Sequence, residues 1–401
     1  MFYAVAAHAQ QENKITIGII DSVYSKTLGE NRKIWVYVPN SNESGIYSKQ
    51  KYPVVYLLDG DAHFYSVVGM IQQLSSVNGN TICPQMIVVG IPNTDRTRDL
   101  TPTHVDVDLP FMDSSFSKNS GGGENFISFI EKELMPHVDS VYPTQPYKML
   151  IGHSFGGLAV INILVHHPYL FNSYVAVDPS MWYAKRKLLN EAKQAFAKND
   201  YSGKALFIGI ANTMNPGMDT VKVKKDTSAF TSHIRSILEL SKYAKLNKQN
   251  HLKFDYKYYK DDDHSSSVLI SEYDALRFIF RFYPLKLTAD DYRDMNKAVI
   301  KKIETHYQTI SKEFGFTVNP PEDIVNNFGY QALNLKNLDN AEYLFKLNTT
   351  NYPESANSFD SLGDLYAAKG DKAKAIESYK KALSLKEVAE TREKLKKLEE
   401  K

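Results

Sequence analysis

The chain has 401 residues, which is enough for two or three domains and for a full enzyme core. Its 48 Lys and Arg nearly balance its 46 Asp and Glu, so the net charge of +2 offers no broad basic field to a nucleic acid or an anionic membrane. The single cysteine, Cys83, excludes an internal disulfide and a Cys-rich zinc site. No stretch reaches the roughly 18 apolar residues that a membrane span requires.

The first 13 residues carry a pattern typical of export. Residues 2–9 are apolar or small, and Ala7-His8-Ala9 has the A-x-A form of a signal-peptidase site. We interpret residues 1–13 as the remaining part of an export signal. The protein is therefore expected in the periplasm or outside the cell.

Residues 14–285 alternate short β-branched or aromatic runs with helical patterns. This alternation predicts an α/β domain with a mainly parallel sheet covered by helices. Residues 15–24 and 32–39 are expected to form an opening hairpin. The expected inner strands are 52–58, 85–91, 148–151, 173–177, 205–210 and 253–259. The expected helices are 124–137, 155–167, 227–243 and 267–282, the first ending near Pro136.

The composition changes after Pro284. Strand patterns stop, and Lys and Glu become more frequent. A long helix is predicted from a cap at Thr288 to about Gly315. We therefore assign residues 286–318 to a connecting helix.

Residues 319–401 contain an internal repeat. Gly329 and Gly363 are 34 residues apart, as are the aromatic positions Phe345 and Tyr379. Small and aromatic residues recurring at this period are typical of tetratricopeptide helix–turn–helix repeats. Because about three repeats are usually needed for stability, we expect these two repeats and a capping helix to dock on the connecting helix or on a second chain. The repeats could thus hold a homodimer or bind a protein partner.

The sharpest chemical motif is residues 152–156, GHSFG, a G-x-S-x-G sequence between an apolar strand and a helix. In that context the serine lies on a strained turn, and the glycines avoid collisions with neighbouring backbone. The motif predicts Ser154 as the nucleophile of a serine hydrolase. Two backbone amides must then stabilise the oxyanion, and we predict those of Phe155 and of Asp61, in the loop after the third strand.

A serine nucleophile needs a base, which in such folds follows it in the order Ser, acid, His. His264 fits, because it lies in a polar turn after the last strand and before the last helix of the domain. His233 lies in a helical pattern and His251 precedes the last strand, so both are interpreted as structural histidines.

The acid is less clearly marked. The strand 205–210 leads into Asn212-Thr213-Met214, with no carboxylate in the first positions. Asp219 is the nearest acid and is the first candidate. Asp178, at the end of the preceding strand, and Asp226, at a predicted helix start, are alternatives, as is a Ser–His dyad. No metal or cofactor is predicted, because the acids at 261–263 lack the spacing of a calcium loop.

Taken in order, these motifs make the chain similar to the Putative esterase family of α/β-hydrolases, which includes siderophore esterases, feruloyl esterases and S-formylglutathione hydrolases. The resemblance covers residues 14–284. It implies an α/β-hydrolase fold and a serine esterase with Ser154 as nucleophile and His264 as base. The siderophore-type members share the Pro-Ser-x-Trp element found here at 179–182. The segments that carry the resemblance are 56–61, 90–102, 121–136, 151–157, 167–171 and 178–182.

We therefore expect a carboxylic ester hydrolase that acts on a siderophore-type or other acylated small-molecule ester through an acyl-enzyme on Ser154. A feruloyl or acetyl esterase acting on polysaccharide is an alternative. A third hypothesis is that the chain is an interaction protein, in which the repeats bind a partner and the hydrolase domain serves as a scaffold. One departure from the resemblance concerns the acid, because Asn212-Thr213-Met214 stands where many relatives carry a carboxylate.

Overall fold

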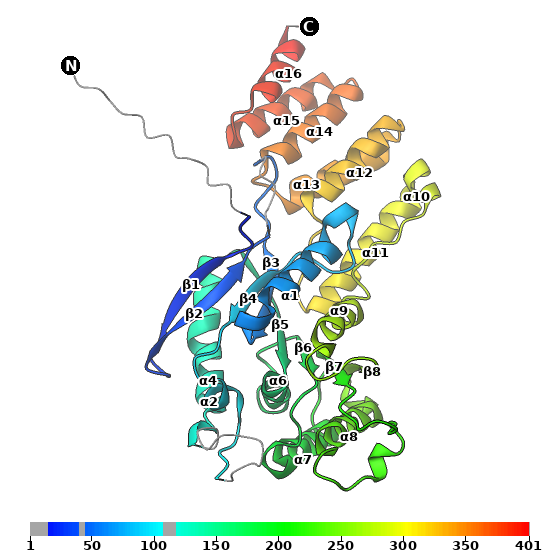
Figure 1. Ribbon diagram of the computed structural model, residues 1–401. Helices are drawn as coiled ribbons and strands as arrows, with labels where there is room; N and C mark the ends of the chain where they lie inside the picture. The colour runs from blue at the N-terminus through cyan, green and yellow to red at the C-terminus, as the bar shows by residue number, and fades with distance from the viewer. Residues whose placement is uncertain (1–14, 40–44, 107–117, 401) are drawn as a thin grey trace, which may run out of the picture.

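A computed structural model describes residues 15–39, 45–106 and 118–400 (Figure 1). The export-like segment 1–13 lies outside the described residues. Within them, no helix combines the length and the apolar character needed to cross a bilayer.

The N-terminal domain is built on an eight-stranded sheet with the order β1-β2-β4-β3-β5-β6-β7-β8. β1 and β2 form an antiparallel hairpin, and β2 also pairs antiparallel with β4. The other neighbouring pairs of strands are parallel. This arrangement confirms the predicted α/β-hydrolase class. The strands are β1 (Ile19–Ser25), β2 (Glu30–Tyr37), β3 (Tyr52–Leu58), β4 (Ile87–Ile91), β5 (Thr144–His153), β6 (Ser173–Val177), β7 (Ala205–Ala211) and β8 (Lys253–Tyr259).

Helices cover both faces of the sheet, as a parallel sheet requires. Every residue of β3 is buried, with Tyr56 and Leu58 in the core on one face and Val55 and Leu57 in the core on the other. The first face is covered by α4 (Gly123–Phe129), α5 (Met135–Val141), α6 (Phe155–His166), α7 (Tyr183–Lys198) and α8 (Ser232–Leu246). The second is covered by α1 (Gly60–Ser75), α9 (Ser267–Ile279) and α11 (Lys297–Phe314).

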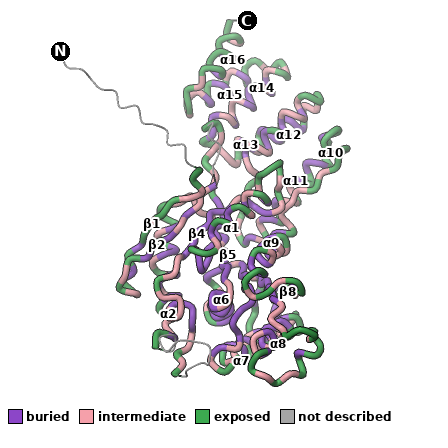
Figure 2. The backbone as a smooth tube through the Cα atoms, viewed as in Figure 1, coloured by how far each residue is buried: buried purple, intermediate pink, exposed green. Residues whose placement is uncertain are grey.

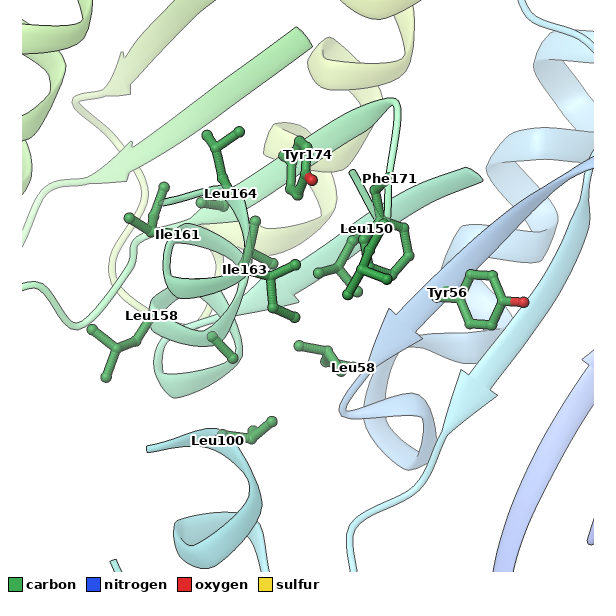
Figure 3. Close-up of a cluster of buried hydrophobic side chains, with 14 of the residues drawn as sticks. Tyr56, Leu58, Leu100, Leu150, Leu158, Ile161, Ile163, Leu164, Phe171 and Tyr174 are labelled. Carbon is green, nitrogen blue, oxygen red and sulfur yellow. The ribbon is translucent and has the colours of Figure 1, made fainter. Parts of the chain in front are cut away.

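The helix α6 is buried along almost its whole length (Figure 2). Its side chains Leu158, Ile161 and Ile163 belong to the same cluster as Leu150 of β5 and Phe171 (Figure 3). This packing holds the start of α6, where the G-x-S-x-G motif lies, rigidly against the centre of the sheet.

The helix expected to end near Pro136 instead runs through it. α4 continues into a π-helical turn, Ile130–Leu134, and then into α5, with Pro136 in the first turn of α5. A proline lacks the N–H that an α-helix interior needs, and a π turn displaces the regular hydrogen bonds just before it. The prediction of a helix end at Pro136 was therefore wrong.

The predicted connecting helix is two helices, α10 (Ala289–Asp294) and α11, not one. Met295 between them is fully buried and has a left-handed backbone with φ of 38°. Its carbonyl accepts hydrogen bonds from Asn337 and Asn340, and Asn296 then caps α11. The cap predicted at Thr288 is present, but the helix that it begins ends at Asp294.

Residues 322–399 form five helices in two similar hairpins and a final helix. At Gly329 an added Cβ would lie 2.5 Å from the ring of Phe345, and at Gly363 it would lie 2.4 Å from the ring of Tyr379. The 34-residue period therefore places a glycine under an aromatic ring in each hairpin. The helices are α12 (Glu322–Asn334), α13 (Leu338–Asn351), α14 (Ala356–Ala368), α15 (Lys372–Leu385) and α16 (Ala389–Glu399).

The helical tail, residues 286–400, shares a hydrophobic core with the sheet domain. Phe314, at the end of α11, has its ring centroid 4.6 Å from that of Tyr147, which lies on β5, and 6.0 Å from that of Phe282. Buried Glu322 of α12 accepts a hydrogen bond from the backbone of Ser48 at 2.9 Å. The boundary near residue 286 is therefore not a flexible linker, and the repeats extend from the end of the domain away from α7 and α8 (Figure 1).

This docking predicts that replacing Phe314 with alanine destabilises the whole chain. Phe314 is 3% exposed, and deleting a buried Phe side chain costs about 3 to 5 kcal/mol of unfolding free energy. Denaturant unfolding would measure the loss. Leu269→Ala, at a leucine on α9 that is 57% exposed, serves as the control and should change stability by less than about 0.5 kcal/mol. An equally small effect at Phe314 would show that the tail does not contribute to the domain's core.

Candidate active site

The G-x-S-x-G motif forms a sharp turn between β5 and α6. Strand β5 ends at His153, Ser154 has φ of 60° and ψ of −113°, and α6 begins at Phe155. A positive φ in a residue with a side chain is strained and is held by its surroundings. An added Cβ at Gly152 would lie 2.5 Å from the backbone of Gly156, so glycine is required for the turn to close. A strained residue that carries a hydroxyl thus joins the end of a strand to the start of a helix.

Parallel strands bring their carboxyl ends to one edge of a sheet, and the candidate residues follow those ends. Ser154 follows β5, Asp178 follows the neighbouring β6, and His264 lies in the turn between β8 and α9. The Nε2 atom of His264 is 3.1 Å from Oγ of Ser154, and its Nδ1 atom is 2.6 Å from Oδ2 of Asp178. One imidazole thus connects a serine hydroxyl to a carboxylate.

The Asp178 carboxylate is completely buried and has several donors. Its Oδ1 atom accepts from the backbone N–H of Ala211 at 3.0 Å, and its Oδ2 atom lies 2.7 Å from Nε2 of His233. Burial opposes the charged form, but the hydrogen bonds from His233 and His264 outweigh it and hold the pKa of Asp178 well below its usual value. Asp178 is therefore a carboxylate anion at neutral pH.

The first-ranked acid, Asp219, lies elsewhere. Its Oδ1 atom accepts from the backbone N–H groups of Val221 and Lys222, at 2.8 and 2.7 Å, which lowers its pKa without involving a histidine. The other alternative, Asp226, accepts from Ser228 and Thr231. Both acids bond within their own loop, and the carboxylate that lies beside His264 is that of Asp178. The backbone at Asp178 has a left-handed conformation with φ of 41°, which no residue pattern predicted.

His153, the variable residue before the serine, holds the loop of His264. Its Nε2 atom is 2.8 Å from the carbonyl oxygen of His264, and the two ring centroids are 4.5 Å apart. Burial, together with the neighbouring His264, lowers the pKa of His153 to about 4. His153 is therefore neutral at physiological pH and donates its Nε2–H to that carbonyl. This contact was not predicted.

The two predicted oxyanion amides lie at the starts of neighbouring helices. Phe155 begins α6 after β5, and Asp61 lies in the first turn of α1 after β3, which pairs with β5. A helix N-terminus presents backbone N–H groups and favours negative charge. The N-termini of α1 and α6 therefore offer the kind of donors that an oxyanion needs.

An ion pair between Arg96 and the buried carboxylate of Asp59 fixes these two turns together. Arg96 donates from Nε and Nη2 to the Asp59 carboxylate, at 2.6 and 2.9 Å, and from Nη2 to the carbonyl of His153 at 3.2 Å. Burial raises the pKa of Asp59, but the Arg96 guanidinium outweighs it and keeps the carboxyl ionised. Asp59 itself has φ of 52°. Its role was not predicted, although it directly precedes the Gly60-Asp61 turn.

Aromatic side chains stand beside the serine. The ring centroid of Phe155 is 6.2 Å from that of Trp182 and 5.5 Å from that of Tyr183, and Arg96 lies over the Phe155 ring. Trp182 is partly exposed, whereas Phe155 and Tyr183 are buried. Trp182 can therefore present an aromatic surface to a ligand.

Asp178, His233 and His264 also form a cluster whose donor atoms lie within 4.8 Å of one another, as a metal site requires. Their hydrogen bonds to one another use the same atoms, and that pairing accounts for the cluster. The acids 261–263 do not join it. We assign no metal to this site.

Comparison with known proteins gives a consistent result. A family model described as Putative esterase matches residues 25–263. The chain is 32% identical over 178 residues to the siderophore enterobactin esterase of Emericella nidulans, which covers 41% of this chain and 57% of the relative. It is 27% identical over 188 residues to the ferri-bacillibactin esterase of Bacillus subtilis, covering 45% and 64%. The alignments therefore span less than two thirds of these relatives.

Solved structures extend the similarity. An IroE-like serine hydrolase from Shewanella oneidensis superposes with a TM-score of 0.68 at 29% identity, covering 83% of this chain and 99% of that one. An uncharacterised protein from Capnocytophaga ochracea has a TM-score of 0.58 at 18% identity and covers 96% of this chain and 99% of that one. The second similarity shows that the fold is shared across most of the chain, including helices of the tail.

Proposed function

Because the chain belongs to the Putative esterase family, we propose that it is a serine esterase that hydrolyses carboxylic esters. The observation that carries the proposal is the relay from Ser154 Oγ to His264 Nε2 at 3.1 Å and from His264 Nδ1 to Asp178 Oδ2 at 2.6 Å. The nucleophile and the acid are each within hydrogen-bonding reach of the base without any rearrangement.

In the proposed mechanism, Ser154 attacks the ester carbonyl while His264 accepts the hydroxyl proton at Nε2. Asp178 keeps the Nδ1–H of His264 in place and stabilises the imidazolium that forms. His264 then gives the proton to the leaving alkoxide, and an acyl-enzyme remains on Ser154. A water molecule, deprotonated by the same histidine, attacks the acyl carbon and releases the acid.

The negative charge of the tetrahedral intermediate would be held by the backbone amides of Phe155 and Asp61. In support, the Arg96–Asp59 pair binds the loop after β3 to the carbonyl of His153, so the two turns that carry these amides are fixed together before substrate binds. Such preorganised donors cost no reorganisation when charge develops.

We further propose a siderophore-type or similar acylated small-molecule ester as the substrate. The names of the relatives support this class, and the partly exposed Trp182 offers a surface on which an aryl acyl group could stack. The proposed site of action is the periplasm or the outside of the cell, from the export-like pattern of residues 1–13. The proposed division is an esterase domain over residues 14–285 joined to tetratricopeptide-like repeats over 319–401, which could serve self-association or a partner protein.

The substrate class can be tested with a panel of esters of matched reactivity. The expected result is hydrolysis of p-nitrophenyl acetate and faster hydrolysis of a cyclic triester of N-aroylserine. Mass spectrometry of the triester products should show the mass of one water gained for each ester bond cleaved. Methyl ferulate and acetylated xylan represent the alternative substrates. Preference for either would replace the siderophore-type substrate but keep the esterase, whereas no hydrolysis of any ester would contradict the proposed function.

A further inference from the structure

A second histidine shares the buried carboxylate of the candidate triad. Oδ2 of Asp178 is 2.6 Å from Nδ1 of His264 and 2.7 Å from Nε2 of His233. The two imidazole rings stand nearly perpendicular, with centroids 5.2 Å apart and an interplanar angle of 83°. His264 has its other nitrogen on Ser154, while His233 approaches from the first turn of α8.

We infer that His233 is a positioning residue that orients the Asp178 carboxylate and divides its charge between two imidazoles, thereby setting the basicity of His264. The inference rests on the proposed function, since it concerns the base of that reaction. It replaces the interpretation of His233 as a purely structural histidine.

The orientation follows from the arrangement of donors around Asp178. The backbone N–H of Ala211 holds Oδ1, and both histidines converge on Oδ2. Asp178 is fully buried, so water cannot replace a lost donor easily. Without His233 the Oδ2 atom would be held by His264 alone. The carboxylate could then rotate while its hydrogen bond to the Ala211 N–H is kept, and this rotation would pull His264 away from Ser154.

The effect on basicity has a definite sign. A donor at Oδ2 draws negative charge away from the contact with His264, whether His233 is neutral or protonated. Removing the donor strengthens the attraction between Asp178 and the protonated form of His264. The acidic limb of the pH–rate profile then moves to higher pH, because His264 becomes protonated, and so unable to act as a base, at a higher pH.

Three other titratable groups lie near His264 or its neighbour His153. His153 from β5 lies against His264, His63 from α1 lies near His153, and Asp263 in the same turn interacts electrostatically with His264. Burial keeps His153 largely neutral, since its pKa is lowered to about 4. These groups are unchanged in a His233 variant, so the predicted shift can be attributed to the lost donor.

The test compares His233→Leu with His233→Gln in p-nitrophenyl acetate hydrolysis between about pH 5 and pH 9. Leucine removes the donor. It should lower kcat about ten- to hundredfold with little change in KM, and move the acidic limb up by about half a unit or more. Glutamine keeps an N–H at the position of Nε2 and does not titrate, so kcat should stay within about threefold of wild type and the limb should stay in place.

Controls keep the outcomes distinct. His166→Leu removes an imidazole that pairs with Glu191 at 3.3 Å on the surface, and it should leave both kcat and the pH profile unchanged. Thermal unfolding confirms that each variant is folded. If the leucine variant does not fold, His233→Phe keeps the ring volume without the donor and takes its place.

The result that overturns the inference is a leucine variant with wild-type kcat and an unmoved limb, or glutamine and leucine variants that lose activity equally. Ser154→Ala is assayed in parallel. If that variant keeps full turnover, the proposed function fails, and the failure is distinguishable because it does not depend on His233.

Discussion

Replacing Ser154 with alanine is expected to lower kcat for p-nitrophenyl acetate by about five orders of magnitude, close to the rate without a nucleophile. The hydroxyl of Ser154 is the group that forms the acyl-enzyme. Ser154 is the residue at the strained turn between β5 and α6, so no neighbouring side chain can take its place. Stopped-flow and steady-state assays would follow p-nitrophenolate release. Circular dichroism would check that the fold is kept, since the change removes one oxygen.

The matched control is Ser265→Ala, at an exposed serine next to His264. It should retain turnover within about threefold, because the hydroxyl lost there is not the one bonded to the base. Substantial turnover by the Ser154 variant would instead assign any esterase activity to another site on the protein.

Replacing Asp178 with asparagine is expected to lower kcat by about three to four orders of magnitude. Asparagine can present an N–H to His264, which favours the imidazole tautomer that cannot accept the proton of Ser154. It also removes the negative charge that stabilises the imidazolium. Asp219→Asn is the paired control and should change kcat by less than about twofold, because that carboxylate caps its own loop.

The same residue predicts a feature of the pH dependence. The pKa of Asp178 lies below its unfolded value, so its charge stabilises the fold at any pH above that value and the stabilisation is lost only as the pH falls through the lower folded value. The acidic limb of the activity profile therefore does not report the titration of Asp178. Asp178→Asn and Asp219→Asn with equal losses would contradict the assignment of the acid.

The sequence predicted most of the sheet because its inner strands are continuous apolar runs. The strand 52–58 has the predicted bounds and is buried at every residue, and the GHSFG motif lies between a strand and a helix as expected. The signal was strong there because local pattern and tertiary burial agree. The helix α1 was not predicted, although it begins at the Gly60-Asp61 turn that was singled out.

The sequence could not show which carboxylate lies beside His264, because that depends on the direction in which each aspartate side chain points. Asp178, Asp219 and Asp226 all follow strands or precede helices, and a linear pattern does not say where a carboxylate points. The left-handed backbone of Asp178 turns its side chain toward His264, and Asn212 after β7 is instead engaged with the carbonyl of Lys260 at 2.8 Å. His233 was missed for the same reason, since its helix reaches the site only through the fold.

The most direct test of the central claim is the mass of the intact chain after treatment with an alkyl fluorophosphonate, followed by peptide mapping. A serine activated by a histidine attacks the phosphorus, loses its proton to that base and expels fluoride. The account predicts one adduct per chain, on the peptide that contains Ser154, and none on the Ser154→Ala variant. An adduct on a different residue, or one that persists in the variant, would contradict it.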